Sequence, residues 1–232
     1  MLSERLTGLY PDLPGNLVLP AGVHVMNPYR SEEVREIVGM FFRKYYHDAY
    51  GRIPLFGINP GRFGAGITGI NFTDPVRLEK ECGIRNSFAK KQELSSVFIY
   101  DLIDAYGGVV QFFSKFILSA VCPLGFVKDG RNLNYYESRT LQSGVDGFIT
   151  RFLQAYLEII GRPSTMICLG EGKNYRYLAA LNEKLGLARE IIPLPHPRWV
   201  MQYRYPLRSV YIQEYLIVLE NLSNHFKSLR YM

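Results

Sequence analysis

The sequence predicts an α/β fold, in which a small central parallel sheet of four strands carries helices on both faces in a three-layer arrangement. Short apolar runs alternate along the chain with longer amphipathic stretches of helical period, and turn residues separate them. A chain of 232 residues with 47% hydrophobic content can bury one sizeable core. We therefore expect one domain that spans residues 1–232.

The predicted strands are short apolar runs with turn residues at their ends. They span Pro54–Asn59, Phe116–Cys122, Thr165–Gly170 and Glu190–Leu194. Runs of this length are typical of the buried strands of a parallel sheet. Ligands of such sheets gather outside the carboxyl ends of the strands, so a site is expected there.

The predicted helices are stretches in which apolar residues recur every three or four positions. They span Ser31–Tyr46, Tyr136–Ile160, Lys173–Leu185 and Ser209–Phe226. Ser31, followed by two acidic residues, is suited to an N-cap position. Strands and helices that alternate in this way imply right-handed crossovers, which place helices on both sides of the sheet.

Composition bounds the classes of function. Lys and Arg exceed Asp and Glu by 27 to 21, and the net charge of +6 suits a polyanionic partner. No apolar run reaches the ~18 residues of a membrane span, and the N-terminus has no apolar core of a secretion signal, so we expect a cytoplasmic protein without a membrane partner. The three cysteines, Cys82, Cys122 and Cys168, are widely spaced and are expected to be reduced thiols.

The first predicted strand runs into a glycine-rich segment, Gly57–Phe72. Within it, Gly64–Gly69 fits the GxGxxG pattern of a dinucleotide site, but Pro60 separates the pattern from the strand and Thr73-Asp74-Pro75 interrupts the helix that should follow. The alternative is that Asn59, held at the strand end by a rigid Pro-Gly turn, orients a water molecule. Phe72 then offers a flat face to a base extruded from DNA.

The last predicted strand ends in Leu194-Pro195-His196-Pro197, where prolines on both sides fix the backbone and one imidazole projects. A lone histidine is more often structural than functional. The position of His196 at a strand end, in the same sheet as Asn59, favours a functional role in the ligand site expected there.

These motifs resemble the single-strand-selective monofunctional uracil-DNA glycosylases of the uracil-DNA glycosylase superfamily. Gly57–Gly61 and Thr68–Phe72 match the family's G-M-N-P-G and T-G-V-P-F, and His196-Pro197 matches its second motif. Cys122-Pro123-Leu124 and Gly130–Leu133 are similar to the segment after its second strand.

The resemblance implies a DNA glycosylase that removes uracil by base flipping. Asn59 would position the attacking water and His196 would stabilise the departing base, while Ile58, Gly61, Phe72 and position 120 would bind that base. Such chemistry builds positive charge on the sugar and negative charge on the base, and it requires no metal and no organic cofactor.

Two departures from the family distinguish this chain. Ala120 stands where the family carries the asparagine that reads the uracil edge, so uracil removal is expected to be accompanied by removal of another deaminated base. After His196-Pro197, the stretch Arg198–Met201 replaces the family's Ser-Pro-Arg-Asn. The chain is therefore expected to belong to a divergent branch.

The segment Arg198–Arg208 mixes cations with large apolar side chains and is expected to be a loop that binds DNA. Such a mixture suits phosphate contact beside insertion into the gap that a flipped base leaves. The residues predicted to contact DNA are Arg198, Trp199, Met201, Tyr203 and Arg204. The alternative is a purely structural role, in which this segment is a surface loop anchored by buried aromatic residues.

The preferred hypothesis is therefore a monofunctional uracil-DNA glycosylase that acts as a monomer on single- or double-stranded DNA. The alternative is a catalytically silent nucleic-acid-binding module of the same fold. A nicotinamide-dependent oxidoreductase rests on the GxGxxG pattern alone.

Overall fold

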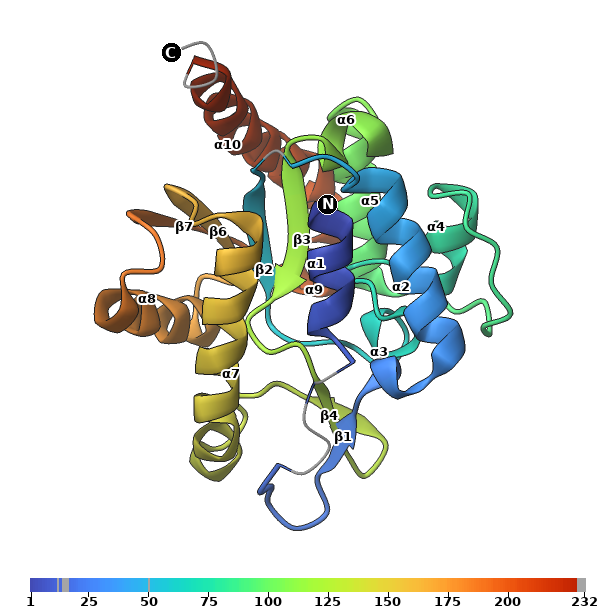
Figure 1. The fold of residues 1–232 in the computed structure, drawn as a ribbon, viewed down its shortest axis with the longest axis vertical. Helices are drawn as coiled ribbons and strands as arrows, with labels where there is room; N and C mark the ends of the chain where they lie inside the picture. Colours follow the sequence, from blue (N-terminus) through green and yellow to red (C-terminus); the bar gives the residue numbers. More distant parts are fainter. Residues whose placement is uncertain (12, 14–16, 50, 229–232) are drawn as a thin grey trace.

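A four-stranded parallel sheet forms the centre of the fold (Figure 1) in the computed structural model, which describes residues 1–11, 13, 17–49 and 51–228. The strand order is β3-β2-β6-β7, and every neighbouring pair is parallel. The strands are β2 (Ile53–Gly57), β3 (Phe116–Ala120), β6 (Thr165–Leu169) and β7 (Glu190–Leu194). The predicted sheet is thus confirmed, with ends that shift by one or two residues.

The two strands that matter for the site, the edge strand β3 and its neighbour β2, run side by side to their carboxyl ends. Gly57, the last residue of β2, pairs with Ala120, the last of β3. The pairing continues past both strands, because the N–H groups of Val121 and Cys122 donate to the carbonyls of Gly57 and Ile58 at 3.0 Å. All residues of both strands are buried, as expected for a sheet covered on both faces.

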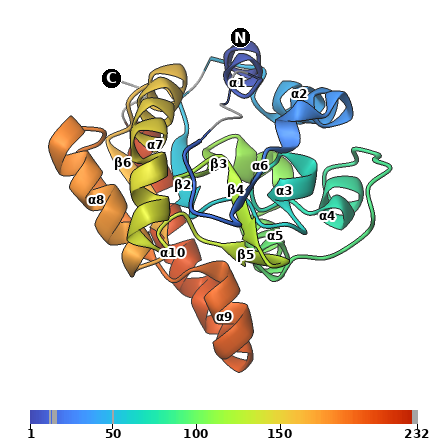
Figure 2. The same cartoon turned by 90° about the horizontal axis from the view of Figure 1, so that it is seen from below.

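Helices cover both faces of the sheet (Figure 2). On one side lie α1 (Leu2–Leu9), α2 (Glu32–Tyr45) and α7 (Arg139–Ile160), and on the other α5 (Leu94–Ala105), α9 (Pro197–Tyr203) and α10 (Arg208–Ser228). Helix α8 (Lys173–Leu185) connects β6 to β7. The predictions for α2, α7, α8 and α10 are confirmed. Helix α7 begins later than predicted because the Ser138 side chain accepts from the Leu141 N–H and caps it there.

A second, antiparallel sheet was not predicted. It contains β1 (His24–Met26), β4 (Gly125–Lys128) and β5 (Arg131–Leu133) in the order β1-β4-β5. Strands this short, with exposed and polar residues, form no apolar run that a sequence pattern can detect. The short helices α3 (Ala65–Thr68), α4 (Pro75–Lys80) and α6 (Val109–Phe113) were not among the four predicted helices, because they are too short for a helical period to show.

The segment after His196 is a helix, so the prediction of a loop from Arg198 to Arg208 is wrong. His196 is the N-cap of α9, and Pro197 occupies its first turn, where a missing N–H costs nothing. A 3-10 turn at Tyr205–Leu207 then leads into α10. None of the helices in the described part of the chain is long and apolar enough to cross a membrane.

Candidate active site

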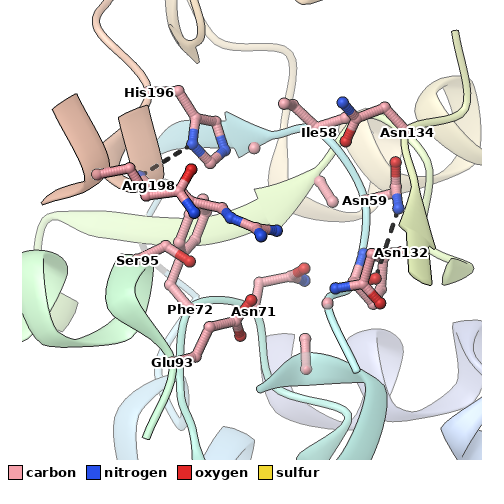
Figure 3. Close-up of a pocket in the computed structure, with 16 residues that line it drawn as sticks. Ile58, Asn59, Asn71, Phe72, Glu93, Ser95, Asn132, Asn134, His196 and Arg198 are labelled. Carbon is pink, nitrogen blue, oxygen red and sulfur yellow. Dashed lines mark hydrogen bonds between the residues drawn. The ribbon is translucent and has the colours of Figure 1, made fainter. Parts of the chain in front are cut away.

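A pocket of about 280 Å³ opens at the carboxyl ends of β2 and β3 (Figure 3). Its walls come from segments that are far apart in the sequence, including the glycine-rich segment after β2 and the start of α9. The structure brings the predicted catalytic and base-binding residues together here, because Ile58, Asn59, Gly61, Phe72, Ala120 and His196 all line the pocket. Arg198, which was predicted to contact DNA, lines it as well.

The side chain of Asn59 is held in one orientation just after β2. Its Oδ1 accepts the Tyr135 N–H at 3.0 Å, and its Nδ2 donates to the Leu133 carbonyl at 3.1 Å. Nδ2 also donates to the Pro60 carbonyl at 3.4 Å, so the hydrogen-bonding capacity that stays available is one lone pair on Oδ1. Asn59 is therefore a rigid polar group that can still bind a small molecule such as water.

The ring of Phe72 is placed by a tight, internally bonded turn. The buried Thr68 hydroxyl donates to the Thr73 carbonyl at 2.6 Å and accepts the Ile70 N–H at 3.2 Å. Phe72 itself has a φ of 57°, a left-handed conformation that is rare for a bulky residue and is found at functional sites. A Cβ at Gly57 would lie 2.5 Å from the Phe72 ring, so glycine at the end of β2 makes room for it.

His196 is neutral and carries its proton on Nε2. The Arg198 backbone N–H donates to Nδ1 at 3.1 Å, which requires Nδ1 to be the unprotonated nitrogen. Burial, with the positive charge of Arg198 as the second cause, lowers the pKa of His196 to about 4. The ring centroids of His196 and Phe72 are 6.2 Å apart, so the imidazole can donate a hydrogen bond to a ring that contacts Phe72.

Glu93 is a polar group of the pocket that the sequence did not single out. Its backbone N–H donates to Asp74 Oδ2 at 2.9 Å, which fixes the residue just before α5. A Cβ at either Gly61 or Gly64 would overlap its carboxyl group, so both glycines make room for it. Burial raises the pKa of Glu93 to about 7, although the nearby positive charge of Arg198 opposes the shift.

The position of Glu93 also bears on the GxGxxG pattern. Gly64, the first glycine of that pattern, packs against the Glu93 carboxyl group, and α3 after it is only 4 residues long. An acidic neighbour and a single helical turn do not suit a pyrophosphate group. Among the described residues, no three His, Cys, Asp or Glu side chains are placed to hold a metal ion.

The residues predicted to contact DNA separate into two groups. Trp199 and Tyr203 are 39% and 66% exposed, and the guanidinium of Arg204 lies over the Trp199 ring at 5.3 Å from its centroid. Arg198 is exposed and reaches over the pocket. Met201, in contrast, is 7% exposed and belongs to the hydrophobic core, so the structure does not bring it to the surface with the others.

Amide and hydroxyl side chains complete the lining, and the sequence did not assign roles to them. They belong to Asn71, Ser95, Asn132, Asn134 and Gln202. The signal for Asn71 was its place beside Phe72, and the signal for Asn132 was its place in the segment Gly130–Leu133. Gln202 lies in the segment Arg198–Arg208, and Ser95 had no signal, because only the tertiary fold carries it to the pocket.

The chain is similar in sequence and structure to known proteins. A search of curated protein sequences found no match, whereas a family model and a solved structure do match. The sequence model of the Uracil DNA glycosylase superfamily matches residues 44–220. Among solved structures, the chain is similar to SMUG2 of Pedobacter heparinus, with 39% sequence identity and a TM-score of 0.93. That similarity covers 96% of this chain and 98% of the other.

Proposed function

Because the chain belongs to the uracil DNA glycosylase superfamily, and is an N-glycosylase of the uracil-DNA glycosylase type, we propose that Asn59 and His196 act together on a base flipped into the pocket. The observation that carries this proposal is the neutral His196 imidazole, whose Nε2–H is left to donate while Asn59 is held rigid in the same pocket. Both groups are fixed before any substrate arrives, as catalysis by preorganised dipoles requires.

The reaction breaks the bond between C1′ of the deoxyribose and the base nitrogen. The electron pair leaves with the base, and His196 Nε2–H donates a hydrogen bond to the base oxygen where negative charge accumulates. Asn59 positions a water molecule whose oxygen bonds to C1′, and the water's proton is released. Asparagine is too weak a base to deprotonate that water first, so the bond to the base breaks ahead of the attack.

Phe72 supplies the flat surface on which the flipped base stacks, with Ile58 and Gly61 beside it. No lysine is found among the residues that the structure places in the pocket lining. A lysine amine is the usual nucleophile of glycosylases that also cut the strand, so we expect a monofunctional enzyme that leaves an abasic site.

DNA is proposed to lie across the exposed face of α9. Arg198 and Arg204 would contact phosphates, while Trp199 and Tyr203 offer apolar surface to the gap that the flipped base leaves. Each of these four side chains is exposed beside the pocket opening or on the helix that begins there.

The range of bases is proposed to extend beyond uracil. Ala120 lines the pocket with a methyl group, so it neither donates nor accepts a hydrogen bond. A pocket with space at this position admits a deaminated purine such as xanthine or hypoxanthine. Replacing Ala120 by Asn should change the preference among these bases.

The test is excision from oligonucleotides that carry uracil, xanthine or hypoxanthine, followed by alkali, which breaks the strand only at an abasic site. We expect cleavage at uracil and at one or more of the others. DNA binding without any alkali-sensitive site would instead support a silent nucleic-acid-binding module, and removal of uracil alone, unchanged by Ala120→Asn, would refute the broader range.

A further inference from the structure

Asn71 is a buried amide for which the described part of the protein supplies no partner. The residue is 8% exposed and lines the pocket, yet its side chain makes no hydrogen bond with any described residue. Figure 3 shows the amide directed toward the middle of the pocket. An amide that borders the pocket without a protein partner keeps its donors and acceptor available to a ligand or water.

The backbone gives this amide little freedom to turn away. Asn71 lies in the turn closed by the Thr68 hydroxyl, and its own carbonyl accepts the Thr73 hydroxyl at 3.3 Å. Tyr100 in turn bonds that hydroxyl at 3.0 Å and ties the turn to α5. The residue after Asn71 is the strained Phe72, so one rigid turn presents both an aromatic face and an amide to the same cavity.

The other amides of the pocket are less suited to read a base. The Asn59 side chain already bonds Leu133 and Tyr135. Asn132 Oδ1 accepts the Arg62 N–H at 3.3 Å. Asn134 and Gln202 also make no side-chain hydrogen bond with the described residues, but both are more exposed than Asn71. Ala120 contributes no polar atom.

We propose that Asn71 is a specificity-determining residue that reads the hydrogen-bonding edge of the flipped base, an inference that rests on the proposed glycosylase function. Uracil presents an N3–H donor beside carbonyl acceptors, and the carboxamide offers an acceptor and a donor that pair with one of each. Cytosine presents the reverse pattern, an unprotonated N3 beside an amino group. With its oxygen toward N3–H, this amide pairs with uracil, whereas in the same orientation cytosine leaves a polar group unpaired.

The experiment measures single-turnover excision of uracil and cytosine from single-stranded oligonucleotides by the wild type and by Asn71→Ala and Asn71→Asp. Asn71→Ala should lower uracil excision by about tenfold to a hundredfold, the effect of one or two lost hydrogen bonds. Asn71→Asp replaces the donor by a second acceptor at constant shape, so the ratio of uracil to cytosine excision should fall. That ratio is insensitive to a general loss of folded protein.

Two further variants separate this reading from a structural role. Asn134→Ala removes a second unpaired amide of the pocket and should keep the wild-type ratio of uracil to cytosine excision. Ala120→Asn, added to Asn71→Ala, returns an amide to the same cavity and should recover part of the lost uracil excision. A wild-type ratio in Asn71→Asp, or loss of the ratio in Asn134→Ala instead, would overturn the inference. A wild type that excises no base would refute the proposed function itself.

Discussion

The hydrogen bond from the Arg198 N–H to His196 Nδ1 determines what the imidazole can do. It leaves the proton on Nε2, and the lowered pKa keeps the ring neutral at physiological pH. In the proposed mechanism, His196 would therefore stabilise the departing base as a hydrogen-bond donor and not as a cation. The Pro195-His196-Pro197 sequence predicted a projecting imidazole, but only the local N-cap geometry indicates which ring nitrogen accepts a hydrogen bond.

Removing either catalytic side chain should leave a protein that binds DNA but scarcely acts on it. We expect Asn59→Ala and His196→Ala each to lower single-turnover excision of uracil by ~10²-fold or more, as for groups that act mainly in the transition state. Affinity for the uracil oligonucleotide should change little. A wild-type rate in the His196 variant would remove that residue from the mechanism.

Glu93 should control the pH dependence of the reaction near neutrality. With a pKa of about 7, Glu93 is neutral below that pH and negatively charged above it. A negative charge in the pocket opposes the charge that accumulates on the base, so kcat/KM for uracil excision should decline as the pH rises through about 7. Glu93→Gln should flatten this limb. His196 should add no inflection between pH 5 and 7, because its pKa is about 4.

Helix α9 is a short, capped helix whose sequence suggests a loop. Its 7 residues are too few for a helical period to show, and prolines flank its start. The consequence is a different sorting of side chains. A loop would expose Trp199 and Met201 alike, whereas the helix turns Met201 toward the core and leaves Trp199 39% exposed.

Substitutions on the two sides of α9 should therefore have different effects. Trp199→Ala should weaken excision from duplex DNA more than from single strands, because an inserted side chain matters only where a stacked partner must be replaced. Met201→Ala should instead lower the free energy of unfolding, by about 2–5 kcal/mol for a buried side chain. Excision assays on both substrates and thermal unfolding distinguish these outcomes. Equal losses on both substrates for Trp199→Ala would argue against a role in insertion.

Across the whole molecule, the main sheet and four long helices could be predicted because their signals are local. The hydrophobic pattern of a buried strand or an amphipathic helix is visible within ten or twenty residues. The rule that ligands gather at carboxyl ends of parallel strands then predicted Asn59 and His196 at one site, and the family resemblance added Ala120; all three line the pocket. Glu93 could not be found this way, because its site depends on Gly61 and Gly64 leaving room for it.

The scattered origin of the pocket also bears on how the protein folds. Asn59 is fixed by Leu133 and Tyr135, and it lines the same pocket as His196, which lies near the other end of the chain. Parallel strands and long loops are slow to close, whereas helices form early, and chains above about 150 residues commonly populate intermediates. After dilution from denaturant, the helical circular dichroism signal should return first and uracil excision only after a lag. Coincident recovery of both signals would indicate a single cooperative step, in which the last loop closure and the first helices are not separable. With a lag, the recovery of uracil excision would measure how long the residues most distant in sequence take to come together in the pocket.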